Sequence, residues 1–262
     1  FMELANDPDA DPDDYAAVIG ADVSLSTELL TLANSSWFGI RNEVTSVKNA
    51  VILLGLGTVR ALAISHCLAG VYSELRLSQD ESRAFWQTAL CKAVAAKRFA
   101  NPWDEELNDA AFLAGMLQDL AIPVMYAMAK EQEMSILLDP ASDWRTQLRA
   151  ERAVFRMDHT EVGRLLARKL GLPELFADIV AFHHNYAALA EFIEDGGLRD
   201  GVYAASLLPH ALNHWNHQDA EELGRFLQEH TQPNPVSTEV FLAVVQREFD
   251  RLFQHFESGQ AP

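Results

Sequence analysis

Residues 112–123 read FLAGMLQDLAIP and lie within a long apolar run, 110–129, which decides the fold class. On a helix drawn over this run, apolar side chains go all the way round, which is typical of a helix buried on most sides. A membrane span has the same pattern, but an Asp at its centre would cost roughly 2.5–3.5 kcal/mol on insertion. The run therefore predicts a buried core helix that contains two polar residues, Gln118 and Asp119.

Outward from this run, helical periodicity dominates, and no segment alternates apolar and polar residues as a half-buried strand does. Helices are expected within 14–35, from Ser46 onward with a break at Gly55 and Gly57, over 80–100, from Asp158 (a capping box with Glu161) to Leu170, over 174–186, and at about 201–216 and 237–256. These elements predict an all-α fold, a multi-helix bundle.

The length, composition and charge of the chain exclude several classes of function. The chain has 262 residues, 49% of them hydrophobic, and a formal charge of −18 from 38 acidic and 20 basic residues. A globular core is affordable at this size, and the negative field disfavours binding to nucleic acid or to anionic membranes. Cys67 and Cys91 lack metal-site spacing and indicate reduced thiols in a cytoplasmic protein. Because the sequence begins with Phe1, we expect a fragment that lacks an upstream domain.

Several polar side chains are candidates for a site. A buried Asp119 needs a hydrogen bond or an opposite charge, so a structural role is the first expectation. His159 would be the first helical residue after the Asp158 cap, at a helix end suited to anions. His183 and His184 would point about 100° apart on a helix, so His183 is expected to face inward and His184 towards the flank.

A second histidine cluster lies near the end of the chain. His210, His214 and His217 have the i, i+4 and i, i+3 spacing that can bind a metal. No carboxylate joins them before Asp219. An ordinary amphipathic helix is the favoured interpretation.

Four stretches in order resemble one family. They are ELLTLANSSWFGIRNEVTSVKNAVILLGLGTVRALAIS (28–65), FWQTALCKAVAAKRFA (85–100), AAFLAGMLQDLAIPVM (110–125) and HTEVGRLLARKLGLPELFADIVAFHH (159–184). Together they are similar to the HDOD family, the HD-related output domains of bacterial signalling proteins, over roughly residues 1–215. The resemblance implies an HD-superfamily-like helical fold. It divides the chain into an HDOD domain (1–215), with a unit 1–105 packed on a bundle 106–215, and a C-terminal extension (216–262).

The HD superfamily includes metal-dependent phosphohydrolases, whose metal is bound by His and Asp residues. Here the position matching the first His is Thr88, and the His of the His-Asp pair is Gln118, which leaves Asp119. His159 and His183 or His184 match histidines kept in part of the superfamily. Thr and Gln oxygens are weak ligands for such metals, so the resemblance implies a degenerate site without metal or cofactor.

The function expected from this resemblance is a non-catalytic regulatory output domain, the effector part of a response regulator or similar bacterial signalling protein. It would act on a protein partner or under an upstream sensory or receiver domain. Two alternatives remain open. One is a phosphohydrolase with a rearranged site of Asp119, His159, His183 and His184; the other is a sensor of a nucleotide or an unidentified small ligand. Trp37 and Phe38 are expected to anchor the junction between the two helical units.

Overall fold

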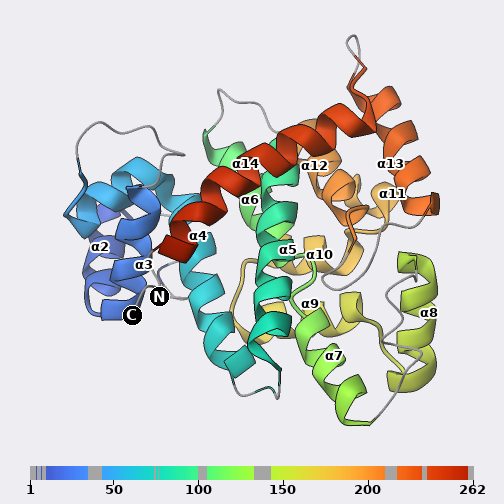
Figure 1. Ribbon diagram of the computed structural model, residues 1–262, viewed down its shortest axis with the longest axis horizontal. Coiled ribbons are helices and arrows are strands. Elements are labelled where there is room, and N and C mark those ends of the chain that lie inside the picture. Colours follow the sequence, from blue (N-terminus) through green and yellow to red (C-terminus); the bar gives the residue numbers. More distant parts are fainter. Residues whose placement is uncertain are drawn as a thin grey trace.

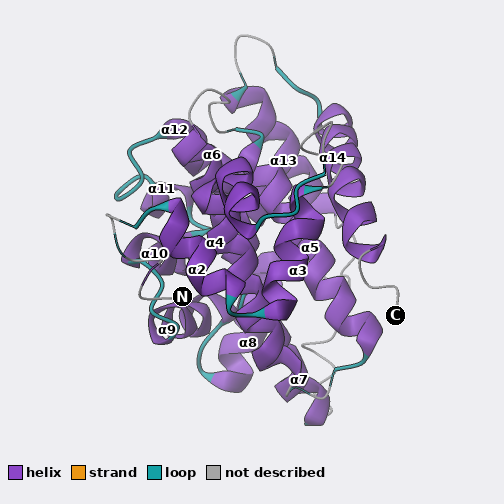
Figure 2. Cartoon of the chain, turned by 90° about the vertical axis from the view of Figure 1, so that its left-hand side faces the viewer, coloured by secondary structure: helices purple, strands orange, loops and turns teal. Residues whose placement is uncertain are grey.

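The computed structural model describes residues 4, 7, 10–34, 43–73, 75, 77–99, 105–132, 143–209, 217–231 and 235–258; positions 61, 65, 67–73, 105–106 and 254–258 are described by their backbone only. Over these ranges the chain forms helices and no strand, which confirms the all-α prediction (Figure 2). The helices are α2 (Pro12–Gly20), α3 (Val23–Ala33), α4 (Val47–Ser73), α5 (Gln79–Lys97), α6 (Glu105–Leu117), α7 (Ile122–Glu131), α8 (Trp144–Phe155), α9 (His159–Lys169), α10 (Glu174–Phe182), α11 (Tyr186–Leu189), α12 (Gly196–Ser206), α13 (His217–His230) and α14 (Thr238–Ser258).

Helix α5 lies at the centre of the molecule and packs against α6, α12 and α14, while α2 and α3 pack on α4 at one end (Figure 1). Two glycines let its neighbours approach closely. A Cβ atom on Gly115 of α6 would lie 2.4 Å from the carbonyl oxygen of Lys92, and one on Gly201 of α12 would lie 2.2 Å from that of Ala96. Both carbonyls belong to α5, so this helix is held from two sides.

The sequence LLGLGTVR marks a bend within α4, as the two glycines predict. Gly55 has a φ of 74°, a left-handed conformation that side chains disfavour. The Asp109 carboxylate of α6 accepts a hydrogen bond from the backbone N–H of Gly57 at 3.0 Å. A Cβ atom on Gly57 would lie 1.9 Å from the Cβ of Asp109. The bend therefore exposes a backbone donor, and the missing side chain lets α6 reach it.

The apolar run 110–129 forms two helices, which corrects the expectation of a single buried core helix. Helix α6 ends at Leu117, a turn covers Gln118 to Ala121, and α7 begins with Pro123 in its first turn. Proline has no N–H to donate to a preceding turn, so it favours a new start. Leu107–Glu131 is long and apolar enough to cross a membrane, but 78% of that apolar window is buried inside the protein. Asp119 therefore lies in a turn within the core.

The C-terminal part also differs from the expectation. Helix α12 ends at Ser206, and α13, which the sequence reading left out, follows at 217–230. Its buried apolar residues are Leu223, Phe226 and Leu227, and they are surrounded by polar residues that hide the pattern. In the second histidine cluster His217 is exposed, and its Nδ1 lies 3.4 Å from the Glu221 carboxylate.

Some expectations fall outside the described residues. These are the roles of His210 and His214 and of Trp37 and Phe38, and the side chain of Cys67. Cys91 is a half-buried free thiol, and burial raises its pKa to about 11. A thiol with so high a pKa is a poor nucleophile at neutral pH, which fits the structural role expected for it.

Candidate functional site

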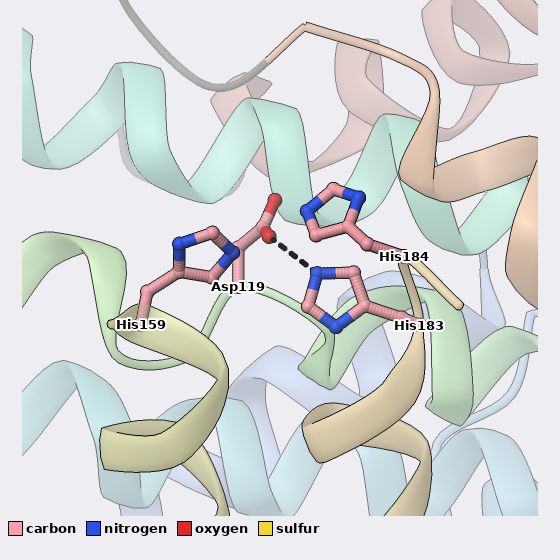
Figure 3. Close-up of side chains that lie close together, drawn as sticks. All are labelled: Asp119, His159, His183 and His184. Atoms are coloured by element: carbon pink, nitrogen blue, oxygen red, sulfur yellow. Dashed lines mark ion pairs between the residues drawn. The ribbon is translucent and has the colours of Figure 1, made fainter. Parts of the chain in front are cut away.

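Four side chains from three parts of the chain meet in the core (Figure 3). Asp119 comes from the turn between α6 and α7, His159 is the first residue of α9, and His183 and His184 follow α10. One potential ligand atom from each lies within 4.8 Å of the others. We call these four residues the His-Asp cluster. All three histidines are buried.

Both adjacent histidines belong to the cluster, which corrects the expectation that His184 points to the flank. Helix α10 ends at Phe182, and the two residues lie in the turn that follows it. Their ring centroids are 4.1 Å apart. Asn185 donates its backbone N–H to the carbonyl of Phe182 at 2.7 Å, which closes the turn.

The orientation of the His183 ring is fixed by the backbone of α10. Its Nδ1 lies 2.8 Å from the carbonyl oxygen of Val180, so Nδ1 carries the hydrogen of a neutral ring. Its Nε2 then faces Oδ1 of Asp119 at 3.5 Å, the contact marked in Figure 3. Burial lowers the pKa of His183 to about 4, against the opposing effect of Asp119. His183 is therefore neutral at physiological pH.

A buried carboxylate holds His159 in place. Oε2 of Glu151 lies 2.8 Å from both Nδ1 and the backbone nitrogen of His159. Burial alone would lower the pKa of His159, but Glu151, together with the charges of Asp119 and Asp158, raises it above its usual value. Asp158 caps α9 through the N–H groups of Thr160 and Glu161, which confirms the predicted capping box.

Helix α8 covers the cluster from one side. The indole of Trp144 stacks on the His184 ring, with centroids 4.5 Å apart and planes 3° from parallel. Arg145 lies over the outer face of Trp144 at 4.1 Å and donates to Glu222 of α13 at 2.9 Å. With Glu151 also on α8, this helix positions two of the three imidazoles.

The sequence reading missed Lys92 of α5. Its side chain is 1% exposed, and its Nζ lies 2.5 Å from Oδ2 of Asp119. The signal was available, because Lys92 interrupts the apolar stretch LCKAVAA (90–96) and lies one turn after Thr88. A lysine on the buried side of a core helix needs an anion, and Asp119 is that anion.

The other two predicted site residues, Gln118 and Thr88, lie on the same two segments as Asp119 and Lys92. Gln118 is fully buried, and its amide nitrogen donates to the carbonyl of Val202 on α12 at 2.6 Å. Its Oε1 is buried without a hydrogen-bond partner among the described residues. Thr88 is half-buried on α5. Gln118 therefore joins the turn after α6 to α12.

Comparison with known proteins identifies the family. The sequence model of the HDOD domain matches residues 1–186. The chain belongs to the HDOD family. An uncharacterized protein of Treponema pallidum (strain Nichols) is 30% identical over 195 residues, which are 71% of this chain and 36% of that protein. The HDOD chain thus spans about a third of the length of this relative.

Solved structures share the HDOD fold. An HDOD domain protein of unknown function from Geobacter sulfurreducens is similar with a TM-score of 0.67 at 19% identity, over 100% of this chain and 90% of that one. A candidate metal-dependent phosphohydrolase from Shewanella amazonensis SB2B gives 0.61 at 18%, over 96% and 88%. A candidate signal transduction protein from Marinobacter aquaeolei VT8 gives 0.63 at 19%, over 98% and 56%. At these identities the likeness shows the fold.

A metal ion is implied by the HD relationship, and the His-Asp cluster matches one in ligand type but not in arrangement. Ligand atoms of a tetrahedral site with bonds of about 2.0–2.2 Å lie about 3.4 Å apart, closer than the 4.8 Å spread seen here. The carboxylate of Asp119 is also already paired with Lys92. A divalent ion about 5 Å from that ammonium would be repelled by about 7 kcal/mol at an effective dielectric constant of 20. The ion pair with Lys92 therefore opposes a divalent ion on Asp119 in this HDOD cluster.

Proposed function

We propose that this HDOD chain is a non-catalytic output module of a bacterial signalling protein. In this role it passes on a conformational signal from a sensory or receiver domain of the same protein, or binds a protein partner. Family membership supports a place in signalling. The chain spans about a third of its Treponema relative, which is consistent with a module inside a longer protein.

The hydrogen bond made by Gln118 is the main support for a non-catalytic role. At the position where the resemblance expects a metal-binding His, the amide instead donates to the carbonyl of Val202 at 2.6 Å. An amide held in this way ties two helices together and offers no nitrogen ligand to a metal. With Thr88 at the other expected His, two nitrogen ligands are replaced by groups that bind such metals weakly.

One specific observation favours a second function, a phosphohydrolase with a rearranged site. The Nδ1 atoms of His159 and His183 face Glu151 and the Val180 carbonyl, which leaves both Nε2 atoms directed into the cluster. Metal-binding histidines are commonly oriented by such partners. This function needs an ion on Asp119 in spite of Lys92.

An activity assay separates the two functions. The chain is purified without metal-chelate resin and given a chromogenic phosphomonoester and a phosphodiester with added Mn²⁺, Mg²⁺, Fe²⁺ or Zn²⁺. The expected result is turnover no higher than that of Asp119→Asn, measured in parallel on protein shown to be folded by circular dichroism. Turnover in the wild type that Asp119→Asn abolishes would establish the phosphohydrolase and refute the non-catalytic module.

A further inference from the structure

We propose that Lys92 is the built-in cation of the His-Asp cluster, which takes the place of a metal ion on Asp119 and keeps divalent metals out. The inference rests on the proposed function only in that the wild-type cluster is metal-free. Its claim is narrower, because it names one side chain as the cause. Removing that side chain should therefore create a metal site.

The Lys92 ammonium occupies one oxygen of the Asp119 carboxylate. The Lys92 ammonium lies 2.5 Å from Oδ2 of Asp119, within the range of a charge-assisted hydrogen bond. Only 1% of the lysine side chain is exposed, so it approaches Asp119 from inside the core. Its backbone cannot shift easily, because Gly115 packs directly against the Lys92 carbonyl. The ammonium is thus fixed on the carboxylate.

The charges of the cluster are already balanced. Within the His-Asp cluster Asp119 is the single carboxylate, and Lys92 balances its charge. The nearby carboxylate of Glu151 is engaged by His159 through two contacts of 2.8 Å. A divalent ion would therefore add two positive charges beside an Asp119 carboxylate that Lys92 already neutralises, in a site where charges interact strongly.

The His-Asp cluster supplies four potential metal ligands. With Lys92 replaced by an apolar residue of similar length, Asp119 loses its ammonium partner and keeps its negative charge beside three buried imidazoles. Three nitrogens and one carboxylate oxygen are a full set for Zn²⁺ or Co²⁺. The gap between 4.8 Å and the spacing of a bound site is small enough for side-chain rotation to close. The cluster is therefore one substitution away from binding metal.

The test compares Lys92→Met with the wild type by Co²⁺ titration, followed by absorption spectroscopy and by elemental analysis after dialysis. Lys97→Met, on the same helix and half-buried, is the matched control. Lys92→Met should bind about one Co²⁺ per chain, on the order of 100-fold or more tighter than the wild type or the control, with the visible bands of a tetrahedral site. The double variant Lys92→Met/His183→Ala should lose these bands.

Equal binding by the wild type and Lys92→Met would overturn the proposal, while the non-catalytic function would still depend on the separate activity assay. A folded Lys92→Met without Co²⁺ binding would also overturn it. If Lys92→Met fails to fold without metal, recovery on refolding with Zn²⁺ supports the proposal. If it stays unfolded, Lys92→Gln, which keeps a hydrogen-bond donor without the charge, takes its place under the same criteria.

Discussion

Removing Asp119 should destabilise this protein far more than an ordinary single substitution, because it strands a buried charge. Lys92 is 1% exposed and Asp119 14% exposed, so the pair is shielded from solvent. At their separation of 2.5 Å the attraction is about 7 kcal/mol at an effective dielectric constant of 20, set against several kcal/mol for desolvating each ion. Breaking such a pair on one side typically costs about 3–5 kcal/mol.

We therefore expect Asp119→Ala to lower the free energy of unfolding by about 3–5 kcal/mol, a large share of the about 5–15 kcal/mol of a typical domain. The double variant Lys92→Met/Asp119→Ala should recover most of this loss, because no unpaired ion remains. Urea denaturation followed by far-ultraviolet circular dichroism measures all three free energies. Lys48→Met is the control, since the Lys48–Asp13 pair is 51% and 63% exposed and should contribute at most about 1 kcal/mol.

Two results would refute this reasoning. A loss below about 1 kcal/mol in Asp119→Ala would mean that Lys92 finds water or another partner at little cost. A double variant as unstable as the sum of its single changes would mean that Lys92 and Asp119 are not coupled.

Three further predictions concern packing, backbone conformation and pH. Gly115→Ala should lower the free energy of unfolding by about 2 kcal/mol or more in urea denaturation, because the new Cβ would lie 2.4 Å from the α5 backbone. Gly20→Ala is the control: a Cβ there would have no atom within 4 Å, so this change should be neutral or slightly stabilising. Gly55→Ala should cost about 1–2 kcal/mol by the same measurement, because φ is 74°; no loss would show that α4 straightens. Although burial acts to raise the pKa of Glu81, Lys130 and other hydrogen-bond donors lower it from 4.5 to about 2. A carboxyl group whose pKa is lowered by folding stabilises the folded state when the pH is above the pKa of that group in the unfolded chain. The wild type should therefore melt at a higher temperature than Glu81→Gln, with the full difference above pH 4.5 and a smaller one as the pH falls towards 2. An advantage that grew on acidification would have the wrong sign.

The fold was largely predictable, because its signals are local. The capping box at Asp158 and Glu161 and the break at Gly55 each depend on a few neighbouring residues, and the structure confirms both. The missed helix α13 shows the limit, since only Leu223, Phe226 and Leu227 form its buried apolar face. The stability of such a helix depends on the surface against which it packs, and the periodicity of its own sequence does not reveal that surface.

The candidate site was less predictable, for geometric reasons. A helix drawn through 174–186 separates His183 from His184 by 100°, whereas in the structure the helix ends at Phe182 and the two ring centroids lie 4.1 Å apart. Helix ends are the least certain part of a prediction from sequence, and here the residues just after one helix end carry the site. A buried lysine could be suspected at Lys92, but its partner could not be named, because Asp119 lies 27 positions away. A pairing at that distance becomes visible only once α5 and α6 are packed.

The same contact fixes both the core and the charge of the site. Gly115 of α6 packs against the carbonyl of Lys92, and Asp119 follows four residues after Gly115. The ammonium and its carboxylate are therefore placed by the close packing of α5 on α6, and a shift between these helices would pull the ion pair apart. Separating a buried pair is costly, so Lys92 and Asp119 resist such a shift.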